Sequence, residues 1–357
     1  MRFIPTSCLR EGMTLSRSLY GKNDNLLLAK DTVLTQQYID GIIKLNCNGI
    51  YIEDNLSKDI EIIETISESL RMETIRSIKN VFIYNPNSIQ MVNSDEIKKS
   101  IINIVDEIIN NKNLMINMID LKVFDNYTYY HSANVAVLSI VMGVALGLNK
   151  DELFKLGLGA LLHDIGKVFI DKEIINKNGR LTREEFDEIK KHPGHGFRYV
   201  REKFEDIPIH SYVAILDHHE KYDGTGYPNG KKGESISLFG RIVSIADVYD
   251  ALTSDRPYRK ALIPAEAMEY AMGASGSLFD PNIVKVFVKK IAPYPVGTCV
   301  KLSNGYTGIV LKNSESCCLR PKVRIFMNND GAVDTFEIDL KNDRRYINTT
   351  IVDTAKI

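Results

Sequence analysis

The first 60 residues alternate between short apolar runs and polar turns around one helical segment. An apolar run at 26–29 follows the turn signal Asn23-Asp24-Asn25 and predicts a strand. Thr35 suits the N-cap of a helix through Ile43, and a further strand is expected at 50–52. This part of the chain therefore predicts a small α+β accessory module.

Residues 61–118 carry apolar side chains at helical spacing in two groups, separated by the Asn-rich stretch 84–88. The first group is Ile63, Ile66, Leu70 and Ile75, and the second is Ile101, Val105, Ile108 and Ile109. Two amphipathic helices in such a linker could join two copies of the chain as a homodimer. Packing of the helices within one chain is an equal alternative.

From 119 to 292 the pattern is almost wholly helical, and from 293 to 357 it changes to short β-rich runs separated by hairpin turn signals. The runs are 299–302, 308–311 and 322–326, and the turn signals are Asn304-Gly305 and Asn329-Asp330-Gly331. The expected fold class is therefore multidomain. A central all-α domain is flanked by the N-terminal α+β module (1–60) with its linking helices and by a small C-terminal β-barrel or sandwich.

Composition and charge narrow the class of protein. The chain has 357 residues, 44% of them hydrophobic and 25% charged, which is the balance of a soluble globular protein with two or three domains. Lys and Arg total 45 against 46 Asp and Glu, which gives a net charge of −1. This charge argues against a broad basic face for nucleic acid or anionic lipid.

The expected location is the cytoplasm. Five cysteines are scattered without a CxxC pair, which favours a reducing compartment and indicates neither a disulfide framework nor a cysteine-ligated zinc site. The N-terminus lacks the pattern of a signal peptide, and the most apolar stretch, 133–148, is too short and too polar for a membrane span. The adjacent Cys317 and Cys318 are expected to be small residues of a β-strand.

All seven histidines lie within one quarter of the chain, which makes the helical region the expected chemical domain. They are His131, His163, His192, His195, His210, His218 and His219. His195 and His210 stand outside the constellation that the other histidines suggest. A polar surface role is expected for His195, and a structural role in a turn is expected for His210.

The pair His163-Asp164 follows an apolar segment, where an ionisable pair is costly to bury without a charged partner. A divalent transition metal removes that cost, because it binds imidazole nitrogen and carboxylate oxygen together. Lys167 would lie on the same face if the helix continues, and could then meet a phosphate oxygen beside the metal. A capped helix end with a surface lysine is the alternative for this pair taken alone.

Four further helical segments each place an imidazole or a carboxylate at an apolar position. They contain His131, His192-Pro193, His218-His219-Glu220 and Asp247. One buried histidine is usually a satisfied core residue, but packing alone does not readily produce five such positions in one domain. The set therefore predicts a polynuclear metal site with nitrogen and oxygen ligands.

These motifs resemble, in order, the HD-GYP domain, a subfamily of the HD metal-dependent phosphohydrolases that degrades the bacterial second messenger cyclic di-GMP. The matching segments are His131-Ser132-Ala133-Asn134-Val135, His163-Asp164-Ile165-Gly166-Lys167, His192-Pro193, His218-His219-Glu220, Asp223-Gly224-Thr225-Gly226-Tyr227-Pro228, Ala246-Asp247 and Thr253-Ser254-Asp255-Arg256-Pro257-Tyr258-Arg259. The resemblance covers about residues 120 to 290. It implies that this protein is a cyclic di-GMP phosphodiesterase.

The resemblance also implies a role for each site residue. One metal would be held by His131, His163, Asp164 and Asp247. Asp164 would bridge to a second metal, which His192 and His218 would also hold. His219 would lie beside them, and which of the two metals it binds is left open. Iron or manganese would be preferred to zinc, and a hydroxide bridging the two metals would attack the phosphodiester.

Lys167 would neutralise the scissile phosphate, Tyr227 would stack on a guanine, and Arg256 and Arg259 would contact phosphates or base edges. A packed loop tyrosine and solvated helix ends are the structural alternatives for these last three residues.

Two other functions remain open beside hydrolysis of cyclic di-GMP to linear pGpG. One is hydrolysis of another cyclic dinucleotide, such as cyclic GMP-AMP, and the other is a non-catalytic receptor or adaptor. In the family, a third metal goes with a Glu four residues before the first histidine, where this chain has Tyr127. A phenol is a poor ligand for a hard divalent ion, so two metals are expected. In the family the fuller site goes with hydrolysis through to GMP, so the resemblance implies linear pGpG as the main product, with further cleavage to GMP left open.

Overall fold

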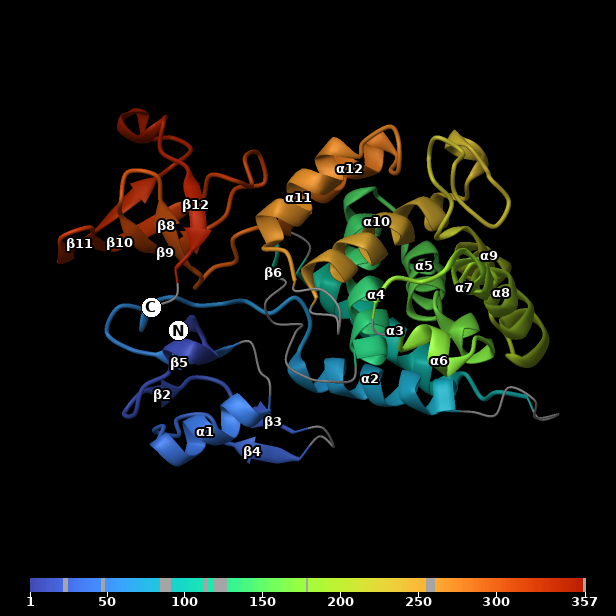
Figure 1. Ribbon diagram of the computed structural model, residues 1–357, viewed down its shortest axis with the longest axis horizontal. Coiled ribbons are helices and arrows are strands. Elements are labelled where there is room, and N and C mark those ends of the chain that lie inside the picture. Colours follow the sequence, from blue (N-terminus) through green and yellow to red (C-terminus); the bar gives the residue numbers. More distant parts are fainter. Residues whose placement is uncertain are drawn as a thin grey trace.

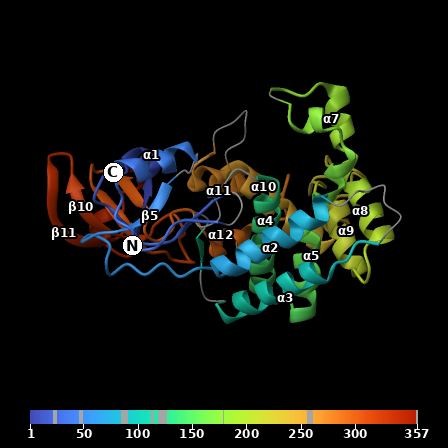
Figure 2. The same ribbon diagram turned by 90° about the horizontal axis from the view of Figure 1, so that it is seen from below.

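The computed structural model describes residues 1–21, 25–45, 49–83, 91–111, 115–117, 127–177, 179–254 and 261–355 (Figure 1). The helical region occupies one end of the molecule. The N-terminal and C-terminal modules lie side by side at the other end, as both views show (Figures 1 and 2).

The N-terminal module is the expected α+β unit. Its strands are β1 (Arg2–Pro5), β2 (Thr14–Leu15), β3 (Leu19–Tyr20), β4 (Leu26–Leu28) and β5 (Gly49–Glu53), and its helix is α1 (Gln36–Lys44). One sheet has the order β1-β5-β2, and β3 pairs with β4. The side chain of Thr35 accepts a hydrogen bond from the backbone N–H of Tyr38, so the predicted N-cap is confirmed. Part of the predicted turn at 23–25 lies outside the described residues.

The linking helices are α2 (Glu68–Ile83) and α3 (Asp95–Asn110). The first begins later than its apolar spacing suggested, and Ile63 lies before it with 55% of its surface exposed. The apolar faces of both helices pack within the chain, α2 on α3 and α4, and α3 on α4 and α5. Intramolecular packing therefore accounts for their amphipathic pattern. The Asn-rich stretch 84–88 lies outside the described residues.

The central region is built around α4 (Tyr127–Ala145), in which every residue from 131 to 143 is buried. A helix that is apolar on all sides is stable only when other helices surround it. Helix α4 packs against α2, α3, α5 (Lys150–Leu161), α10 (Leu238–Thr253) and α12 (Pro281–Lys290). Around these, α9 (Ile209–Asp217) packs on α5 and α10, α8 (His192–Lys203) packs on α9, and α11 (Pro264–Gly273) packs on α10 and α12. The 3₁₀ helix η3 (Ile165–Phe169) and the short helices α6 (Lys172–Ile175) and α7 (Arg183–Ile189) connect α5 to α8.

The C-terminal region is one antiparallel sheet with the order β11-β10-β9-β8-β12. Its strands are β8 (Cys299–Leu302), β9 (Thr307–Lys312), β10 (Lys322–Asn328), β11 (Gly331–Asp339) and β12 (Ile351–Thr354). The three predicted runs are all strands. The placement of Cys317 and Cys318 in a strand was wrong, because they lie in the turn after β9, where Cys317 N–H donates to Ser314 O at 3.0 Å.

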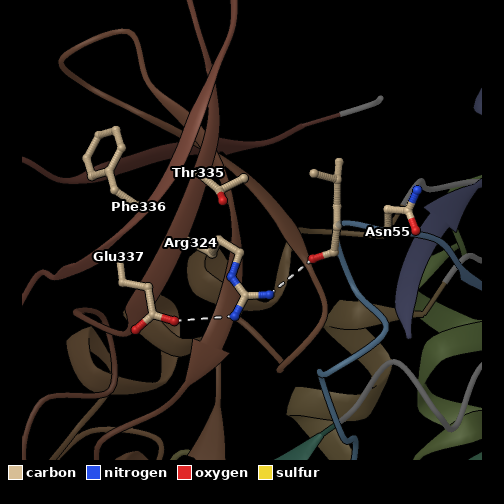
Figure 3. A pocket seen from close by; sticks show the side chains of 6 residues that line it. Asn55, Arg324, Thr335, Phe336 and Glu337 are labelled. Carbon is tan, nitrogen blue, oxygen red and sulfur yellow. Dashed lines mark hydrogen bonds and ion pairs between the residues drawn. The ribbon is translucent and has the colours of Figure 1, made fainter.

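The two flanking modules share contacts, so they form one body. The N–H of Phe3 donates to Gly297 O at 3.1 Å, and Ile60 packs in a buried cluster with residues of the C-terminal sheet. Arg324 donates to both carboxylate oxygens of Asp59 at 2.6 and 2.7 Å. It also donates to Leu56 O at 3.3 Å, beside a pocket at this junction (Figure 3). A parallel pairing of β6 (Ile116–Asn117) with β7 (Ile291–Ala292) joins the end of the linker to the end of the helical region.

Candidate metal centre

The predicted ligands come from separate elements and converge in the helical region. His131 is on α4, His163 and Asp164 are in the turn after α5, His192 begins α8, His218 and His219 follow α9, and Asp247 is on α10. Their ligand atoms form three overlapping groups in which all atoms lie within 4.8 Å of one another. All but His219 are buried. The structure therefore brings the whole predicted ligand set together.

The turn that carries Asp164 differs from the continuous helix considered for this motif. Helix α5 ends at Leu161, and the chain tightens into η3. A Cβ on Gly166 would lie 1.9 Å from the carbonyl oxygen of His192, so only glycine lets η3 pack this closely on α8. Lys167 still reaches Asp164, with its Nζ donating to Oδ2 at 2.5 Å.

In four of the histidines, a hydrogen bond between Nδ1 and a nearby oxygen atom holds the ring in one orientation. The partners are Asp250 Oδ2 for His131 (2.7 Å), Ala160 O for His163 (2.8 Å), Ile189 O for His192 (2.7 Å) and Ile215 O for His218 (2.7 Å). A carbonyl oxygen only accepts, so Nδ1 carries the proton in the last three, and Nε2 keeps a lone pair. This is the orientation that metal-binding histidines adopt.

The Nε2 atom of His163 is buried and has no hydrogen-bond partner among the described residues, although a buried polar atom normally has one. A cation at the centre of the cluster would satisfy it. Nitrogen and oxygen atoms bound to one ion at about 2.1 Å lie about 3 to 3.5 Å apart. The separations between ligand atoms here run from 3.1 to 4.0 Å. The donor set thus fits a transition metal.

The two oxygens of Asp164 face different histidines. Oδ2 lies 3.5 Å from His163 Nε2 and 3.8 Å from His131 Nε2, whereas Oδ1 lies 3.4 Å from His192 Nε2 and 4.0 Å from His218 Nε2. Each oxygen could therefore serve a separate ion.

Asp247 lies beside His131 and His163, the two histidines that face Oδ2 of Asp164. Its Oδ1 lies 3.1 Å from His131 Nε2 and 3.8 Å from His163 Nε2. His219 groups with Asp164, His192 and His218, although its Nδ1 is also 3.8 Å from Asp247 Oδ2. The geometry therefore places His219 between the two groups, nearer the second.

Burial keeps most of the imidazoles neutral and available as ligands. It lowers the pKa of His163 and His218, that of His192 to about 3 and that of His219 to about 4. His131 differs, because burial is outweighed by its hydrogen bonds to Asp247 and Asp250, which raise its pKa to about 9. A metal would have to displace that proton.

The carboxylates stay ionised despite their burial. Burial raises the pKa of Asp164, but Lys167 and the surrounding histidines outweigh it and leave the pKa well below its usual value. The pKa of Asp247 is lowered in the same way by its hydrogen bond with His131 and by the charges of the nearby histidines. Two anionic carboxylates among mostly neutral imidazoles are the charge pattern that a divalent cation requires.

Tyr227 lies against this cluster, with its ring centroid 4.8 Å from that of His219. Its loop is held by Glu220, a buried carboxylate that accepts from the N–H groups of Asn229 (2.8 Å) and Lys231 (3.0 Å). A Cβ on Gly226 would lie 2.2 Å from the Lys221 nitrogen, so glycine is required where the loop turns back. The motif contained Glu220, but its part in holding the loop was not foreseen from the sequence.

Asp250 is the functional residue that the sequence interpretation missed. It lies one turn after Asp247 on α10 and receives His131 Nδ1 at 2.7 Å and Asn134 Nδ2 at 2.9 Å. The i, i+3 spacing of Asp247 and Asp250, matched by that of His131 and Asn134 on α4, was a signal that two facing helix turns pair.

Five further positions named from the sequence have different outcomes. His195 is partly exposed and stacks on Phe169 with ring centroids 5.6 Å apart. His210 is exposed near the start of α9 and not in a turn. Arg256 and Arg259 lie outside the described residues, as does the side chain of Tyr127.

The helical domain gathers five imidazoles and two carboxylates into one candidate metal centre. Residues 113–283 match the family described as "HD domain", and residues 299–357 match the "KOW domain associated with HD domain". The central region of this chain is therefore similar to the HD domain family, over just under half of the chain. The expected resemblance is confirmed by this match and by the similarity of the chain to cyclic di-GMP phosphodiesterases. In the described parts of the chain, no helix is long and apolar enough to cross a membrane.

The chain is 40% identical over 229 residues to a cyclic di-GMP phosphodiesterase of Pseudomonas aeruginosa, a match that covers 63% of this chain and 55% of the relative. It is 35% identical over 191 residues to a 3'3'-cGAMP-specific phosphodiesterase of Vibrio cholerae, covering 53% and 43% of the two chains. The chain thus spans about half the length of these relatives.

A solved structure with a similar fold is an HDG"Y"P protein of Bdellovibrio bacteriovorus. Its TM-score is 0.50 at 21% sequence identity, and the match covers 80% of this chain and 97% of that one. Because the match covers 80% of this chain, the similarity in fold includes residues outside the helical domain.

Proposed function

We propose that this protein is a metal-dependent phosphodiesterase that hydrolyses cyclic di-GMP to linear pGpG. The observation that carries the proposal is the position of Asp164, whose two oxygens face two different pairs of histidines at 3.4 to 4.0 Å. The activity named for the Pseudomonas aeruginosa relative supports the same substrate.

We assign His131, His163, Asp164 and Asp247 to one metal ion, and Asp164, His192, His218 and His219 to a second. Iron or manganese suits a donor set in which several imidazoles accompany carboxylates. When bound, such ions act as Lewis acids that lower the pKa of water and offset charge on a phosphoryl group. The absence of Glu at position 127 supports two ions and not three, and therefore pGpG as the main product.

Lys167 and Tyr227 line the proposed substrate side of the centre. The side chain of Lys167 is one-third exposed and its ammonium is held by Asp164, so it places a positive charge between the buried ligands and solvent. A phosphate oxygen arriving there would meet this charge, and the developing negative charge of hydrolysis would strengthen the contact. Tyr227 offers a ring for a guanine base, and Arg256 and Arg259 remain proposed contacts to phosphates or base edges.

The boundaries 1–60, 61–118, 119–292 and 293–357 remain our proposed division of the chain. The helical domain would carry the chemistry, and the C-terminal sheet would close as a small barrel. A homodimer through the linking helices is the weakest part of this proposal, because their apolar faces already pack inside the chain.

Turnover of cyclic di-GMP and cyclic GMP-AMP by metal-loaded protein, measured side by side, tests the proposed function. We expect faster hydrolysis of cyclic di-GMP. The Vibrio cholerae relative makes cyclic GMP-AMP the specific alternative, and faster turnover of that substrate would favour it. Binding of either dinucleotide without hydrolysis would instead support a receptor or adaptor.

A further inference from the structure

The segment 171–191, here called the arm, connects η3 to α8 and differs from the rest of the helical domain. Of its described residues, 171–177 and 179–191, none is buried. Figure 2 shows α7 standing apart from the helices around α4. The arm begins four residues after Lys167 and ends immediately before His192, so it lies between two parts of the metal centre.

The arm is nevertheless well held. Helix α7 begins with a capping box in which the Thr182 and Glu185 side chains satisfy each other's backbone N–H groups. Lys177 Nζ reaches both carboxylate oxygens of Glu185 at 2.7 Å. At the other end of α7, the carbonyl of Ile189 accepts from His192 Nδ1 at 2.7 Å. This contact fixes α7 to the metal centre.

Phe186 lies one turn before Ile189 and faces the loop of Tyr227. The two ring centroids are 6.4 Å apart, and the ring planes meet at 82°. Phe186 is 44% exposed, although a phenyl ring gains free energy when it is covered. Tyr227 in turn lies 4.8 Å from His219. The exposed ring of Phe186 and the ring of Tyr227 beside the metal centre thus stand nearly at right angles and form a corner.

We infer that Phe186 contacts a purine base of the cyclic dinucleotide substrate, in the corner that it forms with Tyr227. This inference rests on the proposed function. A planar base that stacks on one wall presents its edge to the other, and both arrangements are favourable between aromatic rings. The substrate carries a base beside each phosphodiester, so a phosphodiester at the histidines brings a base to the adjacent corner.

The chemistry of the side chain defines what it can select. Phenylalanine has no hydrogen-bonding group, so Phe186 recognises an aromatic base without distinguishing guanine from adenine. Removing the ring should therefore weaken binding of cyclic di-GMP and cyclic GMP-AMP alike. Because the ring lies outside the ligand set, its removal should leave metal content unchanged.

The chain provides a closely matched control. Phe336 on β11 is 37% exposed and forms a similar perpendicular pair with Tyr306, with centroids 5.6 Å apart and planes at 83°. This pair belongs to the C-terminal sheet and not to the metal centre. A general effect of removing an exposed phenyl ring would appear at both positions.

Steady-state kinetics of metal-loaded variants form the first test. Phe186→Ala should raise the KM for cyclic di-GMP about tenfold or more, the size expected for one lost base contact, with kcat within about twofold of wild type. Phe186→Trp should restore the wild-type KM, and Phe336→Ala should leave it unchanged. A KM within twofold of wild type in Phe186→Ala would overturn the inference.

Fluorescence gives a second readout that does not depend on turnover. The chain contains no tryptophan, so Phe186→Trp and Phe336→Trp each introduce a single fluorophore. Rapid mixing with cyclic di-GMP should quench the emission at position 186 saturably and leave that at 336 unchanged. Absence of quenching at 186 in protein that hydrolyses cyclic di-GMP would overturn the inference alone. If the wild type neither binds nor hydrolyses any cyclic dinucleotide, the proposed function fails and this inference fails with it.

Discussion

The metal centre and the arm are adjacent in the chain, but their residues are held in place by different means. At the centre, nearly every ligand is buried, and four imidazoles are oriented by oxygen atoms of their surroundings. In the described part of the arm no residue is buried, and capping and ion pairs maintain the helix. The proposed ligands are thus part of the core, whereas the proposed base contact stands on a segment outside it.

The largest effect is expected at Asp164, the carboxylate shared by both histidine groups. Asp164→Ala should abolish hydrolysis and remove both metals, because each ion loses a ligand and Lys167 loses its partner. Metal analysis and turnover of the same sample check this. Asp151→Ala on α5, which removes an exposed carboxylate also paired with a lysine at 2.5 Å, is the control and should change neither. Full metal content in Asp164→Ala would refute the shared role.

Lys167→Ala should separate catalysis from metal binding. We expect metal content to stay and the rate to fall by roughly a hundredfold, the loss typical of one charge contact made in the transition state. Lys155→Ala, which breaks the matched pair with Asp151, should leave the rate unchanged. A wild-type rate in Lys167→Ala would show that this lysine serves only as a partner of Asp164.

Asp250→Asn should weaken metal binding without removing a ligand. Asp250 holds His131 Nδ1 at 2.7 Å, and loss of such a supporting carboxylate reduces metal affinity by about ten- to a hundredfold. Competition with a chelator measures the affinity directly. If the affinity of Asp250→Asn equals that of wild type, the orientation of His131 does not depend on this carboxylate.

The free energy of unfolding of metal-free protein should depend on pH because the histidines of the metal centre titrate, and not because of groups in the arm. Burial depresses the pKa of His192 to about 3 and that of His219 to about 4, so the unfolded chain binds more protons below their ordinary value of 6.5. Stability from these groups is complete above about pH 6.5 and falls as the pH drops towards 4. His131, with its pKa raised to about 9, contributes stability below pH 6.5 that is lost as the pH rises through 9.

Denaturant titrations in the presence of a chelator should therefore show maximal stability near neutral pH, with the steeper fall on the acid side, where several histidines act together. His192→Gln should flatten the acid side. Equal stability of the wild-type protein at pH 5 and pH 7 would contradict the neutral, buried state assigned to these imidazoles.

The smallest effects are expected from substitutions in the two capping boxes, which can be compared directly. Asn149 and Glu152 form one at the start of α5, which packs in the core, and Thr182 and Glu185 form the other in the arm. Asn149→Ala should cost about 1 kcal/mol of unfolding free energy. Thr182→Ala should leave thermal unfolding nearly unchanged, because the arm is not buried, and should raise the KM for cyclic di-GMP a few-fold. Equal destabilisation by both changes would show that the arm unfolds with the core.

Much of the metal centre could be predicted from sequence, because its ionisable residues stand at apolar positions, where burying an unpaired charge is costly. These residues are His131, His163, Asp164, His192, His218 and Asp247. Asp250 was missed although its i, i+3 spacing from Asp247 was a signal. The role of Glu220 could not be assigned, since it acts through hydrogen bonds to backbone N–H groups of a folded loop and carries no separate pattern. The apolar spacing at Ile63 suggested helix, but helix α2 begins only at Glu68. Cys317 and Cys318 lie in a turn that the adjacent strands impose.

The central claim is that Asp164 joins two metal ions, and the number of metals per chain tests it most directly. Protein loaded with excess iron or manganese, freed of unbound metal and analysed against protein concentration, should contain two ions per chain. One ion per chain would contradict the bridging position of Asp164, and three would contradict the inference drawn from Tyr127.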